Sequence, residues 1–141
     1  MNETIALSAG FLLALWQAAG PPPVRSIDKG VQSGIALPRQ VIVRDAKEWT
    51  TLWRAHASAR PQPAVDFSRE MVVGVFIGTR PTAGFAVEII GYREAGNDVT
   101  VRYRETTPDR DAIAAQVLVS PYHLVAIPQR AGGVTFEKVQ S

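Results

Sequence analysis

The chain has 141 residues, of which 46% are hydrophobic and 20% are charged, and its net charge at neutral pH is +2. That length suits one domain and is short for two, and the composition is that of an ordinary folded protein. The 15 basic and 13 acidic residues are interspersed along the chain, and nothing in the sequence resembles the basic stripe of a nucleic-acid-binding domain. The absence of cysteine excludes disulfides, thiolate zinc sites and cysteine nucleophiles.

The N-terminal residues carry the evidence on localisation. Residues 5–20, IALSAGFLLALWQAAG, are uncharged, rich in Leu and Ala, and end in small residues before Pro21. Their length suits the hydrophobic part of a signal peptide and is short of the ~20 residues that span a bilayer. Residues 1–20 are therefore expected to be a signal peptide, and the protein to be periplasmic or secreted. The alternatives are a membrane-tethering helix, if the segment stays uncleaved, and a cytoplasmic segment, since residues 1–4 lack Lys and Arg.

Proline and glycine predict a linker before the folded domain. Residues 21–34 hold three prolines and two glycines among scattered polar residues. Residues 35–141 are then expected to form a single domain. Its first strand is predicted over residues 35–44, IALPRQVIVR, with Pro38 placing it at a sheet edge or at a bulge.

A helix is predicted to follow from Asp45 to about Ala59, ending before a proline. Asp45 and Glu48 have the spacing of a capping box. One face of the helix is apolar and consists of Trp49, Leu52, Trp53 and His56. The two tryptophans are expected to pack the helix against a sheet, and a histidine at the end of such a stripe is expected to be structural rather than a metal ligand.

The centre of the sequence is organised around residues 71–91. Residues 71–77, MVVGVFI, are apolar except for Gly74 and predict a strand that is buried on both faces. Residues 78–84, GTRPTAG, break this strand, and residues 85–90 alternate as a second strand. The simplest interpretation is a β-hairpin with a stiff loop. Pro81 and the two flanking glycines would shape the loop in advance, which suits recognition, although an ordinary connection is the alternative.

The C-terminal half predicts further strands. Residues 99–104, VTVRYR, alternate with Arg102 and Arg104 on a solvent-facing side that is either merely hydrated or a cationic rim beside Arg80. Residues 106–111 form a loop without the ligand pattern of a calcium site. Residues 117–128 read as a long extended stretch and residues 134–139 as the last strand.

These elements predict an α+β, mainly-β fold. About six strands, mostly connected by hairpins, should form a curled antiparallel sheet, as a roll or a sandwich, with one capped helix covering one end. The strands at residues 71–77 and 123–127 should be central because both of their faces are apolar.

The sequence offers little for catalysis, so no enzyme activity, cofactor or metal is expected. It has two histidines and no cysteine, and Ser120 lacks the strand-to-helix elbow of a serine nucleophile. His123 lies three residues further on an extended chain, which is a poor arrangement for a nucleophile and its base. No phosphate loop or dinucleotide fingerprint is present. Paired carboxylates that meet only in the fold stay open.

Three motifs together resemble a known family. GTRPTAGFAVEI, VRYRETTP and SPYHLVAIP resemble the C-terminal domain of the PrcB-like family, over about residues 49–136. In the first motif Ala83 stands where the family usually has a second Gly, and Phe85 where it often has Tyr. The family is named for a subunit of a secreted bacterial protease complex, and its members are described as accessory or stability factors. The resemblance therefore implies a non-catalytic module that binds a protein partner, such as a protease.

The expected binding surface is the 78–85 loop with its neighbours in the last motif. Arg80 has no acidic neighbour in sequence and Thr82 is polar, as suits a loop tip. The protein-binding residues are expected to be Thr79, Arg80, Pro81, Thr82, Gly84, Phe85, Tyr122 and His123.

An alternative function is protease inhibition. The RPTAGF sequence is similar to the Asn-Pro-Thr-Thr-Gly-aromatic loop of chagasin-type inhibitors of cysteine proteases, with Arg80 in place of Asn and Ala83 in place of the second Thr. Their Arg-Pro-Trp loop has no counterpart, and Gly132-Gly133 matches at most part of their glycine-rich loop.

We predict that residues 1 to about 20 are absent from the mature protein. N-terminal sequencing of the protein purified from its native host checks this, and an intact Met1 on soluble cytoplasmic protein would refute it.

Overall fold

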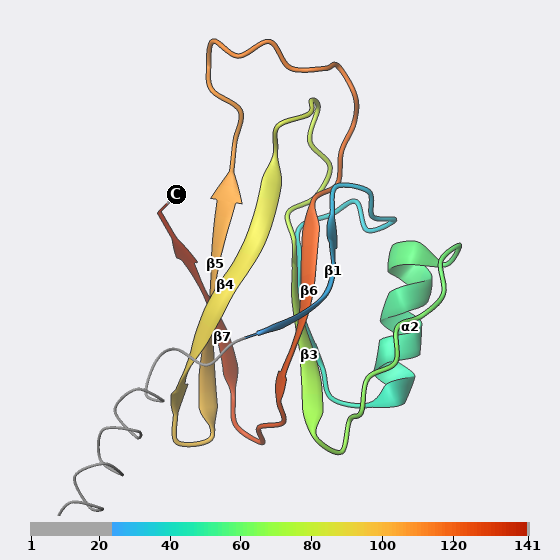
Figure 1. Cartoon of the computed structure of the whole chain (residues 1–141), viewed down its shortest axis with the longest axis vertical. Helices are drawn as coiled ribbons and strands as arrows, with labels where there is room; N and C mark the ends of the chain where they lie inside the picture. Colours follow the sequence, from blue (N-terminus) through green and yellow to red (C-terminus); the bar gives the residue numbers. More distant parts are fainter. Residues whose placement is uncertain (1–23, 141) are drawn as a thin grey trace, which may run out of the picture.

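A computed structural model describes residues 24–140, and its elements carry the labels of Figure 1. The described residues form seven strands and one helix: β1 (Arg25–Gly30), β2 (Arg39–Val43), α2 (Ala46–Ala57), β3 (Glu70–Phe76), β4 (Ala86–Ala95), β5 (Asp98–Thr106), β6 (Tyr122–Pro128) and β7 (Val134–Val139). The predicted mainly-β class with a single helix is confirmed.

The strands form two sheets that face each other (Figure 1). The first has the order β1-β6-β3-β2, and all its neighbours are antiparallel. The second has the order β4-β5-β7, in which β4 and β5 are antiparallel but β5 and β7 are parallel. The sheets make a sandwich, and α2 forms a third layer on the outer face of the first sheet rather than covering one end.

Strands β3 and β6 lie at the centre of the first sheet, as predicted. Met71, Val73 and Val75 of β3 point into the core between the two sheets. Val72 and Phe76 point the other way, into the core beneath α2. Because successive side chains of a strand point to opposite faces, the unbroken apolar run of the sequence fills two cores.

Gly74 has a packing role in this strand. A Cβ atom added there would lie 2.4 Å from Cδ2 of Leu124 and 2.9 Å from Cγ2 of Val41. Those distances are shorter than van der Waals contact, so a larger residue would displace both side chains. The glycine that interrupts the apolar run thus leaves room for two neighbouring strands to fill the core beneath α2.

Helix α2 begins and packs as the sequence predicts. The Asp45 side chain accepts a hydrogen bond of 2.8 Å from the backbone N–H of Glu48, and the Glu48 carboxylate accepts one of 3.2 Å from the N–H of Arg44. The predicted apolar face, Trp49, Leu52, Trp53 and His56, is buried. Both indole N–H groups donate to carbonyls of the following loop, those of Pro63 and Arg60, at 2.9 Å.

The linker predicted over residues 21–34 is wrong for residues 25–30, which form β1. This strand pairs with β6, and Arg25 lies opposite Ala126 and Gly30 opposite Tyr122. Its order comes from backbone bonding to a strand almost a hundred residues away, which no local pattern reveals. The folded domain therefore begins ahead of residue 35, and the predicted signal peptide at residues 1–20 lies outside the described residues.

The predicted hairpin of residues 71–90 is also wrong. β3 pairs with β2 and β6, whereas β4 pairs with β5 in the other sheet. Because β3 already has a neighbour on each side, β4 has no place beside it, and the 78–85 loop carries the chain from one sheet to the other. Within residues 24–140 no helix has both the length and the apolarity needed to cross a bilayer.

We predict that Trp53→Ala lowers the free energy of unfolding by roughly 3–5 kcal/mol, because the indole is 3% exposed and its loss leaves a cavity between α2 and the first sheet. Chemical denaturation measures this. Arg54→Ala, at an exposed position of the same helix, is the control and should change it by no more than about 0.5 kcal/mol. Equal stabilities for both variants would contradict the packing described.

Candidate functional site

Two loops far apart in sequence lie together beyond one end of the sandwich (Figure 1). They are residues 78–85, between β3 and β4, and residues 107–121, between β5 and β6; we call them together the arm. Arg80 and Val119 exchange two backbone hydrogen bonds, of 2.7 and 3.0 Å. The N–H of Ala83 donates to the carbonyl of Ala115 at 3.0 Å. The loops are therefore one unit held by backbone bonds.

The shape of the arm depends on two glycines. Gly78 and Gly84 have φ angles of 83° and 101°, a region that favours glycine. A Cβ atom at Gly78 would also lie 2.9 Å from Pro38, and one at Gly84 would lie 2.8 Å from Pro108. The prediction that this loop is shaped in advance agrees with this geometry.

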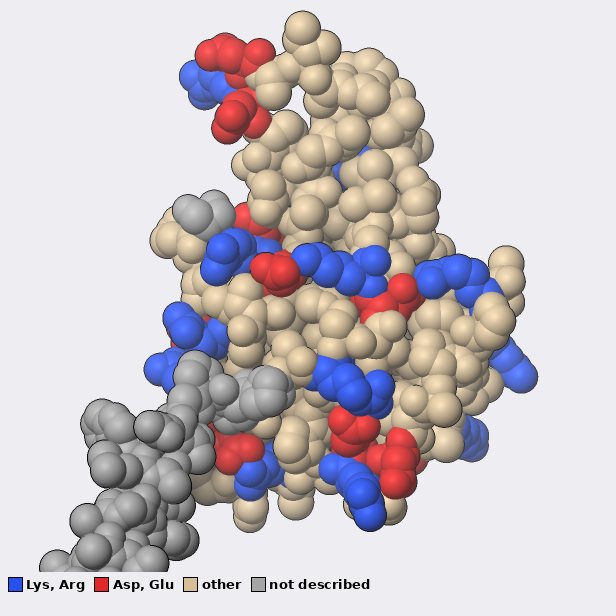
Figure 2. Space-filling model, in the orientation of Figure 1, with Lys and Arg blue, Asp and Glu red and all other residues tan. Residues whose placement is uncertain are grey.

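The outer part of the arm exposes apolar side chains. Ile113 is fully exposed, Leu118 is 70% exposed and Val117 is 49% exposed. Figure 2 shows that most of this projecting end carries no charged side chain, apart from a small group at one corner. Isolated exposed hydrophobic residues are normal on protein surfaces, but several on one projecting, charge-poor loop mark a candidate interaction surface.

Arg80 and Thr82 do not form the exposed loop tip expected from the sequence. The Arg80 guanidinium lies over the Phe85 ring, 5.6 Å from its centroid, and its Nε has no hydrogen-bond partner within residues 24–140. The Thr82 hydroxyl donates to the carbonyl of Ala83 at 3.0 Å. Both side chains are half-buried and shape the loop, whereas Pro81 is exposed.

The other expected binding residues differ in exposure. Thr79 and Gly84 are exposed, and the Thr79 hydroxyl lies 3.1 Å from that of Ser120 on the neighbouring loop. Tyr122 and His123 are 3% and 4% exposed, because β6 is the central strand that their motif forms. These two residues support the site from the core and cannot contact a partner directly. The motif SPYHLVAIP contains both exposed and buried residues because it begins in the arm and continues into the buried strand β6.

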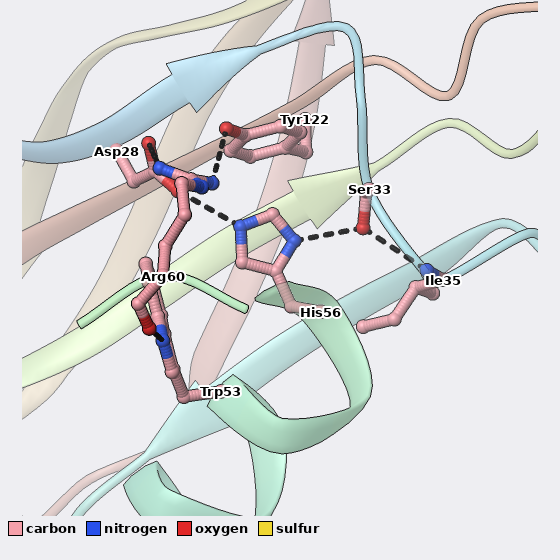
Figure 3. A network of polar contacts seen from close by, with 7 residues as sticks. All are labelled: Asp28, Ser33, Ile35, Trp53, His56, Arg60 and Tyr122. Carbon is pink, nitrogen blue, oxygen red and sulfur yellow. Dashed lines mark hydrogen bonds and ion pairs between the residues drawn. The ribbon is translucent and has the colours of Figure 1, made fainter. Parts of the chain in front are cut away.

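A buried polar network connects β1 with α2 (Figure 3). Nε2 of His56 lies 2.8 Å from the Asp28 carboxylate, and Nδ1 lies 2.8 Å from the Ser33 hydroxyl. Both terminal nitrogens of Arg60 donate hydrogen bonds to the Asp28 carboxylate, Nη2 at 2.8 Å and Nη1 at 3.2 Å. Nη2 also donates to the hydroxyl of Tyr122 at 3.2 Å. The sequence suggested that His56 was structural, but its partners come from the segment that was expected to be a linker.

The charges of this network compensate each other. Burial alone would raise the pKa of Asp28, but hydrogen bonds from Arg60, His56 and Tyr122 together lower it below its ordinary value. Burial lowers the pKa of His56, and the hydrogen bond to Asp28 only partly opposes this. The imidazole is therefore neutral at pH 7, with Nε2–H donating to the carboxylate and Nδ1 accepting from Ser33.

The order Ser33–His56–Asp28 is that of a nucleophile, its base and an orienting carboxylate. Two contacts support a structural role instead. The Ser33 oxygen already accepts the N–H of Ile35 at 3.0 Å, and Asp28 already forms a two-pronged ion pair with Arg60. The His56 side chain is completely enclosed. Within residues 24–140, no three or more His, Asp or Glu side chains lie close enough together to hold a metal ion.

His123 joins the two sheets. Its Nδ1 accepts the backbone N–H of Ile89 at 2.8 Å, and its Nε2 lies 2.9 Å from the hydroxyl of Ser26. Ile89 lies at a bulge in β4, where the register against β5 shifts between Ile89 and Gly91. A bulge interrupts the regular hydrogen bonding between strands, and here the His123 side chain of the other sheet accepts the hydrogen bond from the Ile89 N–H. His123 thus fixes the distance between the sheets directly below the arm.

Comparison with known proteins places the arm inside a family match. Residues 71–128 match the family model described as PrcB C-terminal, a range that runs from β3 through β6 and contains both loops of the arm. The match leaves out β1, β2, α2 and β7. No curated protein sequence and no solved structure matches the chain.

We predict that the free energy of unfolding falls as the pH drops from about 6.5 to about 4. Burial, reinforced by nearby Lys29, lowers the pKa of His123 from 6.5 to about 4, because a proton on Nδ1 would oppose the N–H of Ile89. In that window the unfolded chain binds a proton that the folded chain does not, so acid favours unfolding, by about 3 kcal/mol in all.

Urea denaturation between pH 4 and 8 measures this slope, and NMR titration of the His123 ring identifies the group. The His123→Gln variant should lose part of the slope while keeping the contribution of His56. A His123 ring that titrates near pH 6.5 in the folded protein would contradict the prediction.

Proposed function

Because residues 71–128 match the family model described as PrcB C-terminal, we propose that this protein is a non-catalytic accessory module that binds a protein partner through its arm. The partner is proposed to be a subunit of an exported protease or cell-envelope complex, which the module stabilises. This agrees with the family's name, taken from a subunit of a secreted protease complex, and with the signal-peptide pattern of residues 1–20.

The observation that carries the proposal is the exposed apolar surface of the arm. Ile113, Val117 and Leu118 lie at its outer part with about half or more of their surface exposed to solvent. Burying such side chains against a partner gives about 25 cal/mol for each Å² removed from water. Pro81 is exposed on the neighbouring loop, which is bonded to this one, and adds a further apolar side chain to the exposed surface of the arm.

The construction of the arm favours binding with little entropic cost. Backbone bonds between the two loops already restrict its conformations. A partner then orders few additional groups when it binds. In this proposal Arg80 packs on Phe85 at the base of the arm and shapes it, while the partner contacts the outer residues 113–118.

The geometry of the arm argues against the inhibitor alternative. A chagasin-type mechanism needs the 80–85 loop to enter a protease cleft by itself. Here that loop is bonded along its side to residues 115 and 119, so the cleft would have to accept both loops together. Thr82 also turns its hydroxyl to its own chain.

The network of Ser33, His56 and Asp28 does not favour a hydrolase, because its groups already have partners and link β1 to α2. Inside a protein, fully satisfied polar networks stabilise and specify the local arrangement. We therefore propose that the protein does not catalyse a reaction.

The proposal is tested by pull-down from the native host with the tagged full chain, followed by identification of captured proteins by mass spectrometry. Wild-type protein should recover a protease or envelope subunit. The double variant Ile113→Ser with Leu118→Ser should recover at least about tenfold less, or ~1.4 kcal/mol of binding, because it removes the apolar contacts. Its melting temperature should stay unchanged, since both positions are exposed.

Leu37→Ser is the matched control, because Leu37 is 77% exposed but lies outside the arm. It should recover the same partner as the wild type. Equal recovery by all three proteins would refute the role of the arm. A papain inhibition assay distinguishes the accessory module from a chagasin-type inhibitor. No inhibition is expected, and nanomolar inhibition that the double variant loses would favour the inhibitor.

A further inference from the structure

A hollow of about 350 Å³ lies between the two sheets at the end of the sandwich where the arm begins. Its apolar walls come from the end of β3 and from β5, and its polar groups come from β2, the 78–85 loop and β5. The apolar wall residues are Val75, Ile77 and Tyr103, and the polar ones are Gln40, Arg80 and Glu105. Its volume falls at the lower end of the range for small-ligand sites, about 300–1,000 Å³, and its mixed lining is typical of them.

The alternation of side chains along each strand decides which groups face this hollow. Val41 of β2 packs beneath α2, so Arg39 shares the side of α2 and Gln40 faces the space between the sheets. In β5, Tyr103 packs against the core between the sheets, and Glu105, two residues further on, shares its face. Arg39 therefore borders the hollow, but its charge lies on the other side of the sheet.

The charges that face the hollow do not cancel. Glu105 forms an ion pair with Lys138, which lies on the same face of β7 as Phe136. The pKa of Lys138 is raised, mainly by its hydrogen bond to Glu105, and Arg80 is close enough to oppose this rise. Arg80 forms no ion pair with another described residue. Two cations and one carboxylate leave a net charge of +1, which is the charge of Arg80.

The surroundings of Arg80 favour an anion beside it. Its Nε is enclosed and has no hydrogen-bond partner within residues 24–140, whereas its terminal nitrogens are not enclosed. The guanidinium lies over the Phe85 ring, 5.6 Å from its centroid, and this contact provides no acceptor in the plane of its N–H groups. Because the effective dielectric is lower inside a protein than in water, a partly buried cation gains more from a counterion there.

We propose that this hollow binds a small monocarboxylate with an apolar body. The carboxylate oxygens accept hydrogen bonds from the terminal nitrogens of Arg80, whose planar fork matches a carboxylate. The apolar body lies against Val75, Ile77 and the ring of Tyr103. The hollow lies at the foot of the arm and not at its outer residues 113–118, so the inference does not rest on the function proposed above.

Other ligand charges fit this hollow less well. A dianion such as phosphate would place its second negative charge near Glu105 with no further free cation to meet it. A cationic ligand would meet Arg80 and Lys138, and the one carboxylate between them is already paired. A neutral ligand would leave the charge of Arg80 uncompensated. One negative charge on an apolar body is therefore the match.

The test uses the full chain, labelled with ¹⁵N, and three ligands of similar shape: phenylacetate, phenylethanol and phenylethylamine. NMR titration should show phenylacetate binding at least about tenfold tighter than phenylethanol, because only the carboxylate pairs with Arg80. Phenylethylamine should bind most weakly. Phenylacetate should shift the amide signals of Gln40, Ile77 and Tyr103 and leave those of residues 113–118 unchanged.

Three variants complete the test, and a melting curve of each confirms that it is folded. Arg80→Gln should weaken phenylacetate binding at least about tenfold and leave phenylethanol binding unchanged. Arg39→Gln is the matched control, because it removes the same charge from the other side of the sheet, and it should bind like the wild type. Ile113→Ser with Leu118→Ser should also bind like the wild type, so a failure of the arm and a failure of this hollow are distinguishable.

Several results would overturn the proposal. It is wrong if phenylacetate binds no tighter than phenylethanol, if phenylacetate leaves the amides around the hollow unshifted, or if Arg39→Gln and Arg80→Gln have equal effects. The comparison of ligands on the unmodified chain decides the question even if Arg80→Gln fails to fold.

Discussion

The structure depends on two antiparallel strands, β3 and β6, that are buried on both faces. Each sends alternate side chains into the core between the sheets and into the core beneath α2. Every other element has a position relative to this pair: β1 and β2 extend its sheet at the two edges, α2 covers one face, and the second sheet covers the other. The arm continues the same pair, since the bonds between Arg80 and Val119 extend the β3–β6 ladder beyond the cores.

Buried histidines connect the outer elements to this centre. His56 holds β1 to α2 through Asp28, and His123 holds the bulge of β4 to β6. Each imidazole has hydrogen-bond partners on both ring nitrogens, which offsets the cost of burying polar atoms. These directional bonds add to the close packing of apolar side chains that holds the layers together.

Local sequence patterns predicted an element well where nearby residues, such as a helix cap or an apolar run, determine its structure. The capping residues and the apolar face of α2 were visible in the sequence, as were the two-sided strands at residues 71–77 and 123–127. Features that depend on distant pairing were not visible. β1 has weak strand signals and is ordered by β6, the 78–85 loop joins two sheets instead of a hairpin, and β7 lies parallel to β5. At the candidate site, the sequence located the 78–85 loop but not its partner, because residues 113–118 show no motif and become notable only through their exposure.

The position of β1 has a consequence for the order of folding. Its partner, β6, lies almost a hundred residues further along the chain, and β3 also gains its second neighbour only when β6 is available. The first sheet therefore cannot assemble strand by strand as the chain is synthesised. Proteins dominated by such non-local contacts have a high contact order and fold slowly. Until residue 128 has emerged, the apolar strand at residues 71–77 lacks its central partner, so its side chains stay exposed to aggregation during synthesis.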